Sequence, residues 1–312
     1  MKLYTAPLEG ITGHIFRRTF HECFGGADKY FVPFIKPNQK GHLSTRERQD
    51  VLPENNPGMY TVPQILTNSA EDFLKTTKKL QQYGYREVNL NLGCPSRTVI
   101  TKGRGSGFLA YPEKLDEFLY EVFEKTEAEV SAKTRIGRDS PEEFERILEI
   151  YNRYPMKELI IHPRIQKEFY TGSPHMEVFE TAAKKSRNPL CYNGDIFRVE
   201  DYENVRVRFP QIQSVMLGRG ILKNPGLPRQ LAGGKAMEKQ ELRRFHDLLY
   251  ARYAEELSGE KTILFKMKEL WSFLAPIFTD YEKYAKKIRK AERCKVYEEA
   301  LNALFAEQEL VG

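Results

Sequence analysis

The chain changes its hydrophobic pattern after Asn224. Before that point, eight short apolar or alternating runs recur, and each is followed by a longer segment that is more helical or polar in character. Runs of this length and composition are typical of β-strands. The predicted strands cover residues 2–8, 29–35, 59–66, 87–93, 129–137, 158–164, 190–196 and 214–220.

Helices are predicted between these strands, for example at residues 70–83, 112–125 and 140–154. Asn68 and Ser69 are candidate N-caps for the first of them. The third begins with Ser-Pro-Glu-Glu, which supplies a cap, a proline at the first helical position and acids in the first turn. Strand–helix alternation of this kind predicts a parallel (β/α)8 TIM barrel. A doubly wound open sheet is the alternative, but no GxGxxG motif follows the first predicted strand.

The last part of the chain is predicted to be helical, with no convincing strand between residues 240 and 310. One apolar helix face recurs at steps of four and three, and it consists of Ile263, Met267, Leu270, Leu274 and Ile277. A second such face consists of Tyr284, Ile288, Ala291, Cys294, Tyr297, Leu301 and Leu304. We therefore predict a barrel domain over residues 1–232 and a small helical domain over residues 233–312.

The composition indicates a soluble globular protein. Of the 312 residues, 40% are hydrophobic and 29% are charged, and no apolar run approaches the ~18 residues that a membrane span needs. The N-terminus has no signal-peptide core, and the four cysteines are scattered without metal-ligand spacing. We therefore predict a cytoplasmic protein with no membrane partner and no bound metal. The net charge of +6 is compatible with RNA binding but is also common among proteins that bind none.

Polar side chains stand at the carboxyl ends of the predicted strands. In a (β/α)8 barrel, these ends and the loops after them build the active site. Polar groups are costly to bury without partners, so their convergence at one mouth predicts a polar ligand. The residues at these ends are Pro7, Leu8 and Glu9, then Gln64, Asn91 with Cys94, Lys133 with Arg135, His162 with Arg164, Asn193-Gly194-Asp195, and Gly218-Arg219-Gly220.

The last two strand ends are candidates for a phosphate site. Barrels often bind phosphate with the loops after strands seven and eight, through backbone N–H groups and a helix N-terminus. Gly194 and Gly218 would let the backbone approach a phosphate, and Arg219 would add charge. Each loop alone is also an ordinary tight turn, but the two together favour phosphate binding.

Lys133 and Gln64 have the chemistry that a flavin ring requires. A lysine inside a strand either extends toward solvent or faces a ligand, and a cation near the pyrimidine end of a flavin stabilises the anionic reduced ring. The amide of Gln64 can both donate and accept hydrogen bonds. His162 has two interpretations. It is a core histidine whose hydrogen bonds are made within the protein, or it faces a ligand, and its local sequence slightly favours the first.

Cys94 has three interpretations. It is an inert buried thiol, a covalent nucleophile that needs a base nearby, or a general acid. An unperturbed thiol, with a pKa of about 8.5, is mostly protonated at neutral pH and suits the third role. The composition of the following loop favours an exposed functional cysteine and leaves its resting charge open. That loop contains Arg97, Lys102, Gly103, Arg104, Gly105 and Gly107.

A basic cluster lies near the end of the chain, between residues 283 and 295, where Glu292 is the only acid. Lys283, Lys287 and Lys290 share one helix face, and Lys266 and Lys268 could extend the cluster. A solvated helix face is the usual explanation of such a cluster. Because the remainder of this part of the chain is rather acidic, we interpret the cluster as a contact surface for phosphates.

These motifs together resemble the dihydrouridine synthases, which are flavin-dependent enzymes that reduce uridine in tRNA. The resemblance extends over residues 1–225 and includes APLEGITG, VPQIL around Gln64, NLNLGCPSRTV around Cys94, AKTRIG, IHPR, NGDI and MLGRG. FKMKELWSFL resembles the helical RNA-binding domain of the family. The short N-terminus and APLEG are most similar to the compact bacterial members.

The resemblance implies FMN across the barrel mouth, with NADPH as the reductant. Hydride would pass from the flavin to C6 of uracil, and Cys94 would protonate C5 from the opposite face. Lys133 and Gln64 would contact the polar edge of the ring, with His162 nearby. The backbone of Pro7, Leu8 and Glu9 would contact the ring, and the phosphate end would be held by Asn193, Gly194, Asp195, Gly218 and Arg219.

The substrate implied by the resemblance is a single uridine flipped out of a tRNA loop, because C5 and C6 are stacked away in folded RNA. Asn91, Arg135 and Arg164 would contact the base or its strand. The body of the tRNA would contact Lys266, Lys283, Lys287 and Lys290.

Two positions depart from the family pattern: Leu8 stands where Met is common, and Pro163 follows the strand-end histidine where a small residue is common. We expect a monomer. The alternatives are an FMN-dependent oxidoreductase for a different RNA, such as ribosomal RNA, or for a small molecule, and a non-catalytic RNA-binding protein that kept the fold.

Overall fold

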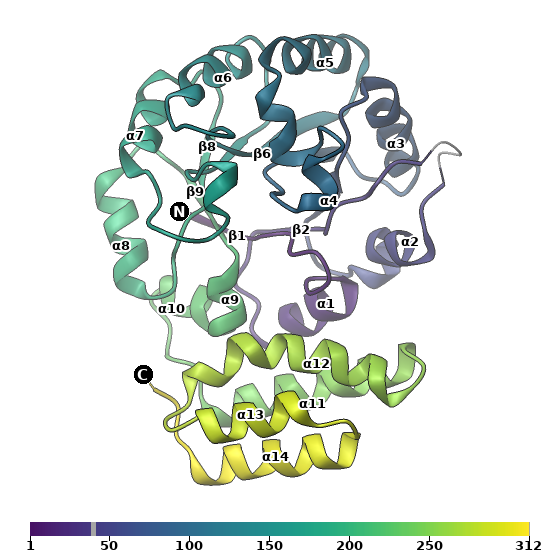
Figure 1. Cartoon of the computed structure of the whole chain (residues 1–312), viewed down its shortest axis with the longest axis vertical. Helices are drawn as coiled ribbons and strands as arrows, with labels where there is room; N and C mark the ends of the chain where they lie inside the picture. The colour runs from purple at the N-terminus through teal and green to yellow at the C-terminus, as the bar shows by residue number, and fades with distance from the viewer. Residues whose placement is uncertain (39–41, 312) are drawn as a thin grey trace.

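The strands of the chain form one parallel sheet that closes into a barrel (Figure 1). The computed structural model describes residues 1–38 and 42–311, and within these ranges the strand order is β3-β2-β1-β9-β8-β7-β6-β5-β4. The strands are β1 (Lys2–Thr5), β2 (Lys29–Phe31), β3 (Thr61–Val62), β4 (Gln64–Ile65), β5 (Glu87–Leu92), β6 (Glu129–Arg135), β7 (Leu159–His162), β8 (Leu190–Tyr192) and β9 (Ser214–Leu217). The predicted TIM barrel is confirmed.

The third predicted strand is divided into β3 and β4 at Pro63, which has no N–H to donate to a ladder. The β3 half pairs with β2, whereas the β4 half pairs with β5. The carbonyl of Pro63 accepts from the backbone N–H of Asn89 at 2.8 Å. The divided strand therefore links the two ends of the sheet, and the open doubly wound sheet is ruled out.

Helices surround the barrel on its outside (Figure 1). They are α1 (His14–Cys23), α2 (Thr45–Val51), α3 (Ala70–Gln82), α4 (Arg97–Ile100), α5 (Pro112–Lys125), α6 (Glu143–Tyr151), α7 (Met176–Lys185), α8 (Val199–Arg208), α9 (Arg219–Lys223) and α10 (Leu227–Leu231). Short 3₁₀ segments also follow β5 and β7, at Gly105–Ala110 and Gln166–Glu168.

The structure confirms one predicted helix start and shifts another. Ser69 caps α3, because its Oγ accepts from the backbone N–H of Asp72 at 3.2 Å. By contrast, α6 begins at Glu143, three residues later than its predicted start at Ser140. The Glu143 carboxylate accepts from the backbone N–H groups of Arg138, Asp139 and Ser140 at 2.7, 2.9 and 3.0 Å. These bonds hold the preceding segment as a turn.

Four helices follow the barrel: α11 (Lys239–Glu256), α12 (Glu260–Leu274), α13 (Glu282–Lys290) and α14 (Cys294–Glu307). The apolar face predicted on α12 is buried, apart from Ile277, which lies beyond the helix end and is partly exposed. The second predicted face is shared between α13 and α14, because the chain turns between Lys290 and Cys294. Figure 1 shows α12 lying between the barrel and α13.

The C-terminal helices pack closely on the barrel. Phe245 of α11 meets the ring of Phe16 of α1 edge to face at 5.9 Å, and Arg252 donates to Thr19 Oγ1 at 3.0 Å. Lys266 of α12 donates to the carbonyl of Gly10 at 2.5 Å. One apolar cluster runs through both parts of the chain. The predicted boundary at residue 233 falls between α10 and α11, and the division into two domains stays a prediction.

None of the helices in the described ranges combines the length and the apolar character that crossing a membrane requires.

Candidate active site

A pocket lies at the carboxyl ends of the strands, where the mouth of the barrel was predicted to bind a ligand. All the predicted cofactor residues except Glu9 and Gln64 line it. The full lining is Ala6, Pro7, Leu8, Lys133, His162, Tyr170, Asn193, Gly194, Asp195, Phe197, Gly218, Arg219 and Gly220. The structure therefore brings together residues from five strand ends that are distant in sequence.

Lys133 projects from β6 into this pocket without a partner. Its ammonium group makes no hydrogen bond or ion pair to any residue in the described ranges. Burial and, secondarily, the nearby Arg135 guanidinium lower the pKa of Lys133 to about 8. An unpaired buried ammonium is costly unless a ligand compensates it, so this group is suited to an electron-rich ring or an anion.

His162, at the end of β7, is held in its neutral form. Burial lowers its pKa far below the ordinary value, and Lys133, Arg135, Arg164 and Arg219 lower it further. Because the Nη1 of Arg164 donates to His162 Nε2 at 3.1 Å, we assign the imidazole proton to Nδ1. His162 is both buried and pocket-lining, so the two interpretations from the sequence do not exclude each other.

Arg164 lies completely buried behind the pocket and donates all its N–H groups within the chain. It forms a bidentate ion pair with the Asp195 carboxylate, at 2.6 and 3.2 Å, and also donates a hydrogen bond to His162 Nε2. The remaining donors reach the carbonyls of Thr171 and Gly172 at 3.1 and 2.5 Å. Arg164 therefore holds the loop after β7 and has no donor left for RNA in this arrangement.

Arg135 is also buried and bonds backbone carbonyls. Its guanidinium donates to Gly93, Ile165 and Phe169 at 3.0, 2.8 and 2.5 Å. These bonds connect the loop after β5 to the loop after β7. The contact of Arg135 with substrate remains a prediction, and the geometry supports a role in shaping the mouth.

Tyr170 covers part of the mouth from the loop after β7, and the sequence interpretation did not single it out. Its ring stacks on His162 at 6.1 Å and lies 4.7 Å from the Arg219 guanidinium. The sequence around Tyr170 does not predict this placement, because an aromatic residue in a polar loop has no periodic pattern around it.

The loops after β8 and β9 present backbone donors to the pocket. Among the described residues, the N–H groups of Gly194, Asp195 and Gly218 have no hydrogen-bond partner. A Cβ on Gly194 would lie 2.0 Å from Tyr192 Oη, so only glycine fits there. Arg219 lies beside these groups and pairs with Asp195 at 2.5 Å. Unpaired backbone donors beside a guanidinium suit a phosphate group.

A chain of buried amides runs through the barrel to Cys94. The backbone N–H groups of Gly93 and Cys94 donate to Asn91 Oδ1 at 3.1 and 2.9 Å. Asn91 Nδ2 donates to Gln64 Oε1 at 2.7 Å, and Gln64 Nε2 donates to Asn89 Oδ1 at 2.7 Å. Asn89 Nδ2 ends the chain on Ser131 Oγ at 2.9 Å. Sequence analysis missed Asn89 and Ser131, although an asparagine in a buried strand was a usable signal.

Cys94 is half-buried against Phe34, Leu66 and Val99. Burial raises the pKa of the Cys94 thiol, and the opposing effect of the Ser96 N–H is smaller. A raised pKa favours the protonated thiol at neutral pH, which is the form that the general-acid interpretation requires. Gly105, with φ +57°, packs so closely that a Cβ would lie 2.8 Å from the Cys94 carbonyl oxygen.

The remaining predicted residues lie outside the pocket. Glu9 is exposed and pairs with Arg46 of α2 at 2.8 Å. Lys266 is bonded to Gly10, as described above, and Lys283 lies 3.4 Å from Glu307 of α14. Lys287 and Lys290 are exposed on α13. The structure therefore does not gather the predicted tRNA-binding lysines at the mouth itself.

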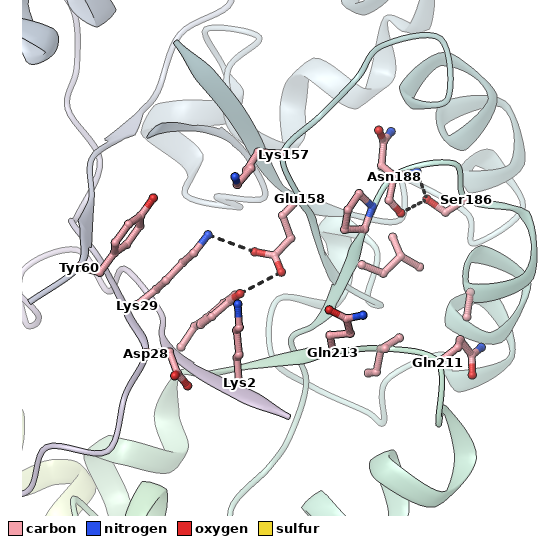
Figure 2. A pocket seen from close by; sticks show the side chains of 15 residues that line it. Lys2, Asp28, Lys29, Tyr60, Lys157, Glu158, Ser186, Asn188, Gln211 and Gln213 are labelled. Atoms are coloured by element: carbon pink, nitrogen blue, oxygen red, sulfur yellow. Dashed lines mark hydrogen bonds and ion pairs between the residues drawn. The ribbon is translucent and has the colours of Figure 1, made fainter. Parts of the chain in front are cut away.

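A larger cavity of about 660 Å³ lies at the opposite end of the barrel (Figure 2). Lys29 donates to Glu87 Oε2 at 2.9 Å and lies 3.7 Å from Glu158, which also accepts from Tyr4 Oη at 3.1 Å. This end of a TIM barrel serves stability, and no predicted site residue lines the cavity. We therefore place the functional site at the other end.

No cluster of three or more histidine, cysteine, aspartate or glutamate side chains suited to a metal ion occurs in residues 1–38 and 42–311.

Comparisons with known proteins show what this chain is similar to. A probable tRNA-dihydrouridine synthase of Staphylococcus aureus is 29% identical over 265 residues, which cover 80% of this chain and 78% of that protein. A tRNA-dihydrouridine(16) synthase of Pseudomonas putida is 25% identical over 307 residues, which cover 94% of each chain. Among solved structures, morphinone reductase covers 78% of this chain and 88% of its own, with a TM-score of 0.53 and 13% identity, which shows a shared barrel fold.

The model of the dihydrouridine synthase family matches residues 4–311. Because this match spans the barrel and the C-terminal helices alike, the protein belongs to the dihydrouridine synthase family.

Proposed function

We propose that this protein reduces uridine to 5,6-dihydrouridine in tRNA, with Cys94 as the proton donor. The observation that carries the proposal is a half-buried thiol with a raised pKa, whose backbone is fixed by Asn91. Cys94 does not line the mouth pocket itself, but Asn91 pairs in register with Lys133, the unpaired lysine of that pocket. The names of the relatives from S. aureus and P. putida support tRNA as the substrate.

The pocket residues fit FMN. Lys133 would face the electron-rich edge of the ring, and Pro7 and Leu8 would contact it from β1. The N–H groups of Gly194 and Gly218, with the Arg219 guanidinium, would hold the phosphate. A bound flavin supplies the hydride for C6 of uracil, and NADPH is the proposed reductant.

The protein's own residues hold and move the proton. Cys94 keeps its proton because burial disfavours the thiolate, and it passes that proton to C5 of the base. Asn91 fixes the backbone of Cys94, and the Asn91–Gln64–Asn89 chain fixes the orientation of each amide. His162 stays neutral and can donate only from Nδ1.

The substrate must bring one uridine out of its stack before C5 and C6 become accessible, and loop nucleotides do this at the lowest cost. The C-terminal helices beside the mouth provide the cations for the rest of the tRNA; the sequence interpretation assigns Lys266, Lys283, Lys287 and Lys290 to this task. We place the reaction in the cytoplasm and propose that a monomer carries it out.

The test is a rescue in a bacterial strain that lacks all its own dihydrouridine synthases. Dihydrouridine is then mapped in tRNA and ribosomal RNA by mass spectrometry, with tRNA position 16 mapped first, because the P. putida relative carries that position in its name. Dihydrouridine that returns with the wild type and disappears with Cys94→Ala supports the proposal. A yellow protein that restores none contradicts it and points to a small-molecule substrate; dihydrouridine in ribosomal RNA alone points to a different RNA.

A further inference from the structure

Phe169 has a backbone conformation that bulky residues rarely adopt. It lies in the loop after β7, directly before Tyr170, with φ +52° and ψ −97°. In residues 1–38 and 42–311 the only other residue besides glycine with a positive φ is Asp280, and aspartate tolerates that region far better than phenylalanine does. Phe169 is therefore a genuine backbone outlier.

This conformation belongs to a tight turn. The backbone N–H of Thr171 donates to the carbonyl of Glu168 at 2.8 Å and closes a four-residue turn in which Phe169 and Tyr170 are the central residues. A positive φ with a negative ψ at the first central position is the geometry of a type II′ turn, where glycine is the usual residue. A phenylalanine thus stands where glycine would fit without strain.

Two buried arginines hold the turn in place. Arg135 Nη2 donates to the carbonyl of Phe169 at 2.5 Å, and Arg164 donates to the carbonyls of Thr171 and Gly172 at 3.1 and 2.5 Å. Strained backbone persists only where the surrounding contacts determine it, and it concentrates at functional sites. The turn is anchored on the same arginines that shape the mouth.

The ring of Phe169 does not offset this strain by packing. It is 49% exposed, and in the described part of the chain it meets no second aromatic ring and no cation. The neighbouring ring of Tyr170 differs, because it stacks on His162 in the mouth pocket and lies 4.7 Å from the Arg219 guanidinium. One turn therefore presents two rings, one inside the pocket and one in solvent at its edge.

We propose that the exposed ring of Phe169 stacks on the nucleobase next to the target uridine. When a uridine is drawn out of its stack, the base beside it also loses a stacking partner. Aromatic side chains stack on such bases whatever their identity. Because the turn holds the ring at the edge of the mouth before RNA binds, little ordering is needed on binding. The inference rests on the proposed function and assigns a contact to its substrate.

Variants of Phe169 separate the effect of the ring from that of the strained backbone. Phe169→Gly removes the ring and the strain, Phe169→Ala removes the ring alone, and Phe169→Leu keeps apolar bulk without an aromatic face. Phe169→Gly should unfold at a higher temperature than Phe169→Ala, since only glycine adopts this φ freely. All three should nevertheless bind unmodified tRNA about fivefold or more weakly than the wild type, whereas Phe169→Trp should bind it as tightly.

The control is Tyr120→Ala, which removes a 61% exposed ring from α5 on the outside of the barrel and should leave tRNA binding unchanged. Flavin content confirms that each variant folds. If tRNA binding by the Phe169 variants follows their thermal stability rather than the presence of an aromatic ring, Phe169 has only a structural role and the proposal is overturned.

A second experiment identifies the base that the ring contacts. Once the rescue has mapped the modified position, tRNA is prepared with an abasic nucleotide on either side of the target uridine. One of these tRNAs should bind the wild type about fivefold or more weakly than intact tRNA, yet bind Phe169→Ala no more weakly than intact tRNA does. Equal losses in the two proteins, for both abasic tRNAs, would overturn the contact.

The two half-reactions distinguish an RNA contact from a contact with the reductant. Reduction of the flavin by NADPH should proceed at the wild-type rate in every Phe169 variant. Slower reduction together with normal tRNA binding would assign the ring to the reductant and overturn the proposal. If the wild type forms dihydrouridine and every variant binds tRNA as tightly, only this inference is wrong; a wild type that neither binds tRNA nor forms dihydrouridine overturns the proposed function as well.

Discussion

Asn91 Oδ1 accepts the backbone N–H of Cys94 at 2.9 Å, so the residue expected to contact the base also fixes the residue expected to protonate it. The same oxygen accepts the N–H of Gly93, and the Asn91 amide donates to Gln64. The position of the thiol is therefore coupled to a polar chain that crosses the barrel from β6.

Replacing Asn91 should reduce both the stability of the protein and its rate of catalysis. Asn91→Ala leaves the partly buried N–H groups of Gly93 and Cys94 without an acceptor, and each such loss costs up to about 1–3 kcal/mol. We expect lower thermal stability, retained flavin and at least a tenfold lower rate of dihydrouridine formation. Ser131→Ala is the control at the far end of the chain, since it leaves the Cys94 N–H bond intact. Equal rate losses in the two variants would contradict the coupling.

The Cys94 thiol should react slowly with alkylating reagents at neutral pH. Burial raises its pKa, and only the thiolate attacks such reagents. We expect alkylation of the Cys94 peptide, followed by mass spectrometry from pH 6 to pH 10, to increase only in the alkaline range. Free glutathione is the reference. A Cys94 that reacts faster than glutathione at pH 7 would show that the thiolate is its resting form.

Flavin affinity should decrease as the pH rises through about 8. Below the lowered Lys133 pKa of about 8 the ammonium is charged and stabilises an electron-rich ring edge; above it, that charge is lost. The measurement is FMN dissociation from the protein at pH 6.5 to 9.5. Lys133→Gln should bind FMN more weakly at pH 7 and lose the dependence. A wild-type affinity for FMN that does not change over this pH range would show that the charge of Lys133 does not stabilise the bound cofactor.

Asp195→Asn should destabilise the fold through Arg164. Arg164 is completely buried, and removing its charged partner leaves an uncompensated guanidinium, at a cost of roughly 3–5 kcal/mol. Arg219 is partly exposed, so Arg219→Gln should cost much less. Denaturant unfolding of both variants checks the difference. Equal losses would mean that Asp195 acts mainly through Arg219.

The fold could be predicted from the sequence because the barrel repeats one local pattern, a strand followed by a helix. Each predicted strand contains a strand of the structure, and α5 occurs at its predicted bounds. The division of the third strand and the late start of α6 depend on Pro63 and on the Glu143 carboxylate, which act on backbone hydrogen bonds rather than on periodicity.

The location of the site at the barrel mouth could be predicted for the same reason, since carboxyl strand ends converge in any TIM barrel. The direction in which individual side chains point could not be predicted. Arg164 stands at a strand end, a position that suggests a ligand contact. Its N–H groups nevertheless donate to Asp195 and to carbonyls of its own loop. Tyr170 reaches the mouth from a loop without a periodic pattern. On α13, Lys286 and Arg289 line a groove against α12, whereas Lys283 lies 3.4 Å from Glu307 of α14, and the sequence alone does not distinguish these positions.

The central claim, that Cys94 supplies the proton to uracil, is tested most directly by one turnover. Protein with its flavin reduced is mixed without oxygen with unmodified tRNA, and flavin reoxidation and dihydrouridine are followed together for the wild type and Cys94→Ala. We predict that Cys94→Ala binds flavin and tRNA normally but reoxidises its flavin at least a hundredfold more slowly and forms almost no dihydrouridine. Turnover of Cys94→Ala at the wild-type rate would contradict the account.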